Sequence, residues 1–141
     1  MKKIFVAILI SLTALSCSQR DNRIVRRIAK HIDAHDQTLD LSTIAPFEWD
    51  RVFFFQPYTA QSTIEQAIGC PWAEYKKSGI GYSDTFTLIL FVNKGEVVAW
   101  CRNPRNNGEC TTLYGTNGYT RADAFIIEYS GWAKWPNIKK K

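Results

Sequence analysis

The chain has 141 residues, of which 45% are hydrophobic and 13% aromatic, and this composition excludes an intrinsically disordered protein. The length fits one modest globular domain. The formal net charge is +5, but no basic stripe interleaved with aromatic residues is evident, so we expect no nucleic-acid partner.

The N-terminus has the pattern of an export signal. Lys2 and Lys3 form a short basic region, and an almost uninterrupted apolar run follows from Ile4 to Leu15. A membrane-spanning helix needs roughly 20 apolar residues, so this run is too short for a permanent span. We therefore interpret residues 1–16 as a cleaved signal peptide.

The end of this segment, Ala14-Leu15-Ser16-Cys17, resembles the processing box of bacterial lipoproteins. Ser16 and Cys17 match its last two positions, whereas Leu15 is bulkier than the usual residue. The resemblance implies lipid, including palmitate, on Cys17 and a membrane anchor. Ser18, by the sorting rule of enteric bacteria, implies the outer membrane, facing the periplasm. The alternative is ordinary signal peptidase cleavage, which leaves Cys17 as a thiol.

After the signal we expect a tether at residues 17–22 and one domain over residues 23–141. The first predicted helix covers residues 23–37, with Asp21 or Asn22 as its N-cap. Its apolar stripe consists of isoleucines at helical spacing: Ile24, Ile28 and Ile32.

The middle of the chain predicts a strand and then a short helix. Residues 38–48 are less regular, and residues 49–56 are aromatic and β-branched, as expected of a strand. Ser62-Thr63-Ile64-Glu65 reads as a capping box, and Gly69 can end the helix that it starts.

The second half predicts a β-hairpin. Its strands are residues 86–92 and 96–101, and Asn93-Lys94-Gly95 forms a three-residue loop. A last strand is expected at residues 124–129, and residues 131–141 trail off. The predicted fold is α+β, a small antiparallel sheet with the N-terminal helix and the short second helix packed on one face.

A second resemblance rests on Ser62 to Pro71 followed by Phe86 to Trp100. A short helix that ends in a Gly-x-Pro step before paired strands is similar to BamE-like outer-membrane assembly lipoproteins. The match covers about forty residues. It departs from the family because the segment from Trp72 to Asp84 is short and polar. The resemblance implies a non-enzymatic scaffold or binding role.

The other three cysteines suit an oxidising compartment. Cys101 and Cys110 flank a polar, turn-rich stretch, and we predict a disulfide between them. Cys70 would then be a small buried apolar residue. The spacing fits neither a zinc site nor a Cys-x-x-Cys redox motif, so no metal and no cofactor are expected.

Candidate catalytic residues are few. His31 and His35 are four residues apart, with Asp33 and Asp36 nearby, and could face a metal together. A zinc-protease motif would need Glu where Ile32 stands. No Gly-x-Ser-x-Gly elbow is present. Glu48 and Asp50 flank Trp49 and suit a strand start better than a glycosidase pair. We predict that the protein is not an enzyme.

Two surface hypotheses remain open. The C-terminal aromatic residues could bind a sugar or a protein, or could cover the edge of the sheet. They are Tyr129, Trp132 and Trp135, beside Lys134. The polar stretch between Cys101 and Cys110 could contact an anionic partner, or could be a solvated turn. It contains Arg102, Arg105, Asn106 and Asn107.

The leading functional hypothesis is a lipid-anchored envelope protein with a non-enzymatic binding or assembly role and a protein partner. The first alternative is a periplasmic inhibitor or immunity-type protein that blocks an enzyme or toxin. A small hydrolase or metal-binding protein is the second alternative.

Overall fold

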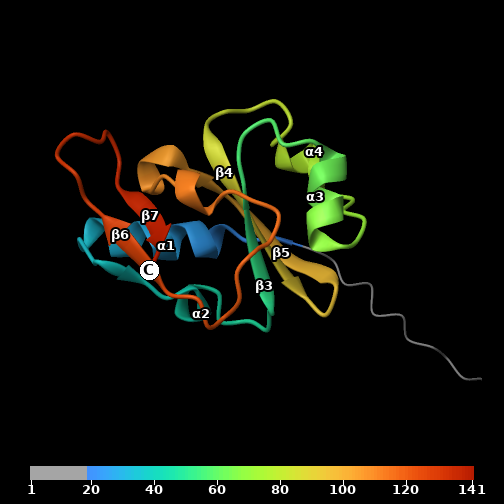
Figure 1. Ribbon diagram of the computed structural model, residues 1–141, viewed down its shortest axis with the longest axis horizontal. Helices are drawn as coiled ribbons and strands as arrows, with labels where there is room; N and C mark the ends of the chain where they lie inside the picture. Colours follow the sequence, from blue (N-terminus) through green and yellow to red (C-terminus); the bar gives the residue numbers. More distant parts are fainter. Residues whose placement is uncertain (1–18) are drawn as a thin grey trace, which may run out of the picture.

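The computed structural model describes residues 19–141, and it shows an α+β fold (Figure 1). A four-stranded sheet has the order β1-β5-β4-β3, and a three-stranded sheet has the order β2-β6-β7. The strands are β1 (Gln19–Arg20), β2 (Thr38–Leu39), β3 (Arg51–Phe55), β4 (Phe86–Asn93), β5 (Glu96–Pro104), β6 (Phe125–Glu128) and β7 (Asn137–Lys140). Among residues 19–141, no helix has the length and apolarity needed to cross a membrane.

The predicted hairpin forms the centre of the larger sheet. β4 and β5 pair antiparallel from Phe86↔Pro104 to Asn93↔Glu96, so the turn has two residues and not the three expected. Lys94 and Gly95 have φ angles of 50° and 76°, which suit the tight turn of a hairpin. The Asp50 carboxylate accepts a hydrogen bond from the Lys94 N–H at 2.8 Å, which fixes this turn to the start of β3.

The central strand β4 is buried on both faces. Every residue from Phe86 to Val92 is buried, and successive side chains point into two separate apolar clusters. Ile89 and Phe91 belong to the first cluster, whereas Leu88 and Leu90 belong to the second. A strand of this kind needs cover on both sides, because each exposed apolar side chain would lose the free energy of burial.

The first face is covered by α1 (Asn22–Asp33), α2 (Leu41–Ile44) and the three-stranded sheet. α1 buries Ile24 and Ile28, and its N-cap is Asp21, one of the two residues predicted for that position. The predicted helix ended at residue 37, but α1 ends at Asp33, and His35 has a positive φ of 56°.

The second face is covered by α3 (Gln61–Ile68) and α4 (Tyr75–Ser78). α3 buries Ile64 and Ile68 against the sheet and ends at Gly69, which has a φ of 77°. This confirms the predicted termination. The N-terminal helix and the short second helix therefore lie on opposite faces, and the prediction of one common face was wrong.

Three further local predictions were wrong. The expected capping box does not form, because Ala60 is the N-cap and the Glu65 carboxylate accepts a hydrogen bond from the Trp72 N–H at 2.9 Å. The end of the chain is not irregular, as was expected of residues 131–141, because β7 pairs with β6. The fold also begins within the predicted tether, because β1 pairs in parallel with β5.

Replacement of Phe91 by Ala should lower the free energy of unfolding by about 3–5 kcal/mol. The Phe91 side chain is fully buried, and its ring meets Trp49 at 5.3 Å and Phe47 at 5.5 Å between centroids. Urea unfolding measures the change. Trp132→Ala is the control and should change stability by less than about 0.5 kcal/mol, because Trp132 is fully exposed. Equal losses in the two variants would contradict the described core.

Loss of the α1 cap should destabilise the protein in a pH-dependent way. The Asp21 carboxylate accepts hydrogen bonds from the Arg23 side chain and N–H, and these contacts lower the pKa of Asp21. Asp21→Ala should cost about 1 kcal/mol at pH 7. The stabilisation is present above the carboxyl's unfolded pKa, near 4, and is lost as pH falls through the lower folded pKa. Urea unfolding at pH 7 and pH 3 should therefore show a smaller difference at the lower pH.

Candidate functional sites

The proposed lipid attachment residue, Cys17, lies outside the described residues. Cys101 and Cys110 are separate buried thiols in the structure, so the predicted disulfide is not formed in it. Cys101 faces the first core cluster from β5, and Cys110 joins the same cluster after a short 3-10 helix at Arg105–Asn107. Burial raises the pKa of both thiols, that of Cys110 to about 12.

Buried amides hold the stretch that the disulfide was expected to close. Asn103 and Asn107 are both buried, and the Asn107 side-chain amide donates to the Asn103 Oδ1 at 2.8 Å. The same amide donates to the Val25 carbonyl of α1 at 3.1 Å. The Asn103 amide in turn donates to the Gly108 carbonyl at 3.1 Å. The stretch is therefore fixed to α1 by hydrogen bonds and is not a solvated turn throughout.

The two histidines do not share a site. The His31 Nδ1 lies 2.7 Å from the Asp36 Oδ2, whereas the His35 ring stacks on Tyr129 with centroids 5.0 Å apart. Within residues 19–141, no group of three His, Cys, Asp or Glu residues has an arrangement that could hold a metal ion. Asp33 is exposed at the end of α1.

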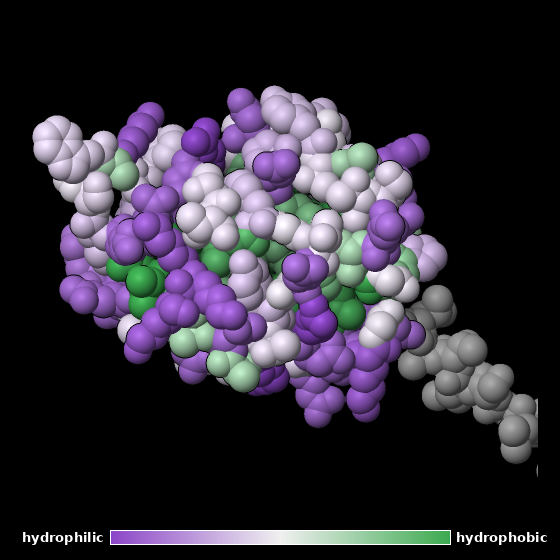
Figure 2. All heavy atoms as spheres, in the orientation of Figure 1, coloured by the Kyte–Doolittle hydropathy of each residue, from purple (hydrophilic) through white to green (hydrophobic). Residues whose placement is uncertain are grey.

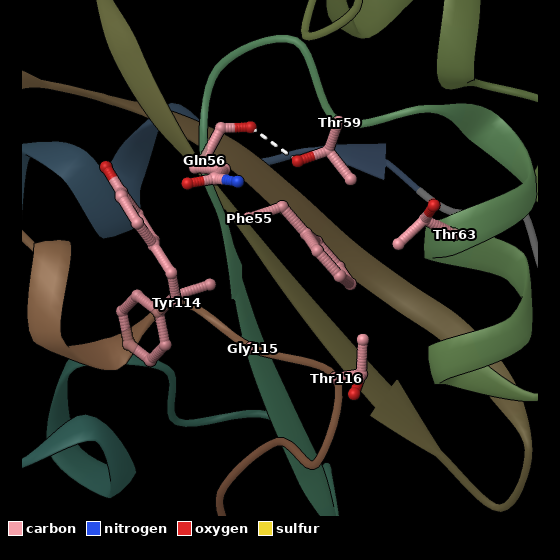
Figure 3. Close-up of a pocket in the computed structure, with 8 residues that line it drawn as sticks. Phe55, Gln56, Thr59, Thr63, Tyr114, Gly115 and Thr116 are labelled. Atoms are coloured by element: carbon pink, nitrogen blue, oxygen red, sulfur yellow. Dashed lines mark hydrogen bonds between the residues drawn. The ribbon is translucent and has the colours of Figure 1, made fainter.

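A shallow groove opens beside β3, the outer strand of the larger sheet (Figure 3). Val52 of β3 exchanges two backbone hydrogen bonds of 2.8 Å with Tyr119, and Phe54 forms a bridge with Tyr114, so the loop at residues 114–119 covers part of this edge. The groove lies between that loop and α3, with Phe55 between them in Figure 3.

Apolar and uncharged polar groups line this groove, which has a volume of about 260 Å³. They belong to Phe54, Phe55, Gln56, Thr59, Thr63, Tyr114, Gly115 and Thr116. The Thr59 hydroxyl donates to the Gln56 carbonyl at 2.6 Å, and the Tyr114 hydroxyl is 2.9 Å from that of Thr87. The lining contains no carboxylate, histidine, lysine or cysteine to act as acid, base or nucleophile. The lining offers apolar contacts and uncharged hydrogen-bonding groups.

The loop between β6 and β7 projects from the body of the protein (Figures 1 and 2). Its base is held in place, because the Tyr129 hydroxyl donates to the Asp36 carbonyl at 3.0 Å. The partly buried Trp135 ring lies beside the Arg105 guanidinium at 5.1 Å and the Lys134 ammonium at 4.6 Å. Trp132, between these two anchors, is 100% exposed.

The three aromatic residues that the sequence grouped together have different surroundings in the structure, and the two tryptophans differ most. Trp135 packs beside Arg105, whereas Trp132 is fully exposed. Figure 2 shows a surface that is mostly hydrophilic or intermediate, with hydrophobic residues visible only in small areas. The groove at β3 was missed from the sequence, because its lining comes from three separate segments.

No known protein family, curated protein or solved structure matches this chain.

Thiol labelling of the mature Cys17→Ala protein distinguishes free from paired cysteines. At pH 8, Cys70 should react first, because Cys101 and Cys110 are buried and their raised pKa values leave little thiolate. Unfolding without a reductant should then expose both remaining thiols. Labelling of Cys70 alone after unfolding would instead show that Cys101 and Cys110 are paired in the protein.

Proposed function

We propose that this is a lipid-anchored protein of the bacterial cell envelope with a non-enzymatic role, which binds a protein partner through the β6–β7 loop. The observation that carries the partner proposal is the complete exposure of Trp132. An indole that gains nothing from burial in its own fold can gain much at an interface, and Trp is enriched among residues that dominate binding energy.

The shape of the loop supports binding through Trp132. Tyr129 and Trp135 are tied to the body on either side, so only the tip is fully exposed. The Ser130 hydroxyl accepts hydrogen bonds from the backbone N–H groups of Trp132 and Ala133, each at 3.2 Å, which shapes the tip. A loop tip that hydrogen bonds already hold in one conformation loses less conformational entropy on binding than a flexible segment does.

The concave surfaces support a protein partner over a small-molecule substrate. The hollow at β3 holds about 260 Å³, below the range of about 300–1,000 Å³ for small-molecule sites. Two further hollows, one beside Trp135 of about 300 Å³ and one beside Trp49 of about 370 Å³, reach only the low end of that range. None of these three hollows is lined by two carboxylates or by a histidine.

The second candidate function is inhibition of an enzyme or toxin. A projecting loop with an aromatic tip can enter the concave active site of a partner, and this convex shape favours the candidate (Figure 1). Both candidates use Trp132 as the contact residue. They differ in whether the partner is active when bound.

The anchor proposal is tested by the intact mass and detergent partition of the mature protein. The wild type should carry a lipid-sized mass and enter the detergent phase, and Cys17→Ala should lose both properties. Cys70→Ala is the matched control and should keep both. A mature wild-type chain without added mass would refute the anchor and support a secreted protein.

The partner proposal is tested by photocrosslinking in cells. A photoreactive phenylalanine at position 132 should give one adduct of defined mass, and the same residue at Tyr82 should not. Tyr82 is 75% exposed and lies after α4, which makes it a suitable control. With the partner purified, Trp132→Ala should weaken binding about 30-fold, as expected of a residue worth about 2 kcal/mol. Equal crosslinking at the two positions, or unchanged affinity, would contradict the proposal.

A further inference from the structure

The exposed face of α1 carries a row of cations. Arg23, Arg26 and Lys30 follow one another at helical spacing and are all exposed, while Ile24 and Ile28 are buried on the opposite side. Arg20 is exposed on β1, next to the start of the helix. We call these four cations, Arg20, Arg23, Arg26 and Lys30, the basic strip. It ends at the exposed Asp33.

Little negative charge opposes the basic strip. Asp21 pairs with Arg23 at 2.8 Å, and the ion pairs found within residues 19–141 involve none of Arg20, Arg26 and Lys30. Arg27 lies beside the strip and donates to the Ile44 carbonyl at 2.8 Å, which leaves its charge unpaired as well.

The segment that contains the strip accounts for the whole positive excess of the chain after the signal region. The chain has 18 Lys and Arg against 13 Asp and Glu, and Lys2 and Lys3 belong to the signal region, so the remaining excess is three positive charges. Residues 19–32 alone carry five Arg and Lys against the single Asp21, an excess of four. The rest of the domain is therefore close to neutral.

The chain length places the strip near the proposed lipid attachment residue. Arg20 is three positions after Cys17 in the chain, and three residue steps span at most about 11 Å. Along α1, the seven steps from Arg23 to Lys30 advance by about 10 Å. A lipid on Cys17 would hold the near end of the strip within about one or two Debye lengths of the membrane surface.

We infer that the basic strip binds the anionic headgroups of the membrane that holds the protein. Exposed cations beside a membrane attachment point are attracted to anionic lipids, with a gain of about fivefold in partition for each cation near the surface. This attraction would orient α1 against the membrane. The closeness of the strip to the membrane rests on the proposed anchor. Its affinity for anionic headgroups does not.

The test uses the mature Cys17→Ala chain, so that no lipid on the protein contributes. Vesicles of phosphatidylcholine alone are compared with vesicles that also contain phosphatidylglycerol, by co-sedimentation. The Cys17→Ala chain with an unchanged strip should bind only the anionic vesicles, and added salt should weaken this binding by screening the charges. Arg26→Gln with Lys30→Gln should reduce partition about 25-fold, by fivefold for each cation.

The matched control is Lys76→Gln with Lys77→Gln on α4. These lysines are exposed on the element that covers the other face of the sheet, and their replacement removes the same charge. The control should retain most of the binding. An equal loss in both double variants, equal binding to both vesicle types, or no binding to either would overturn the inference. Circular dichroism and urea unfolding check that each variant is folded.

The two proposals fail in different ways. An absent lipid mass on the wild type refutes the anchor, and the vesicle result on the Cys17→Ala chain is unaffected by it. The double variant on α1 could instead lose binding to anionic cell-wall polymer and keep its binding to vesicles. In that case the strip binds the cell wall, and the inference is wrong.

Discussion

The fold depends on a central strand that is apolar on both faces. Because β4 buries every side chain from Phe86 to Val92, neither face of the sheet can be left to solvent. On one side the cover comes from α1 and the small second sheet, and on the other side from α3 and α4. Both layers are thin, and α2 and α4 have only four residues each. Packing against the sheet, and not helix length, stabilises these short elements.

Hydrogen bonds from a few side chains hold three connecting segments in place against the rest of the domain. Asp50 holds the hairpin turn, Asn107 joins the stretch after β5 to α1, and Tyr129 ties the projecting loop to the end of α1. Each contact joins residues far apart in the chain. A buried amide pair thus holds the stretch between Cys101 and Cys110, while both thiols contribute to the apolar core.

The proposed functions use different parts of the domain. The chain enters the fold at Gln19, and the β6–β7 loop lies at the far end of the long axis (Figure 1). An anchor on Cys17 and the fully exposed Trp132 would lie towards opposite ends of α1, since Tyr129, at the base of the loop, bonds to the Asp36 carbonyl just after the helix. The basic strip begins beside the entry point, where it would meet headgroups. Cys17, the basic strip and Trp132 are different residues, so each can be substituted separately.

The sequence by itself predicts export from the pattern before Cys17, and it determined the elements whose signals are local. Asp21 caps α1, Gly69 ends α3, and the apolar runs around residues 94–95 make the hairpin, because neighbouring residues set each of these. Only the tertiary structure decided which face each helix covers, since that depends on contacts between distant segments. It also placed the Glu65 carboxylate where it accepts hydrogen bonds from the Trp72 N–H and the Gln61 side chain and does not form a capping box. The β3 groove and the exposure of Trp132 likewise follow from how separate segments pack, which no local pattern in the sequence encodes.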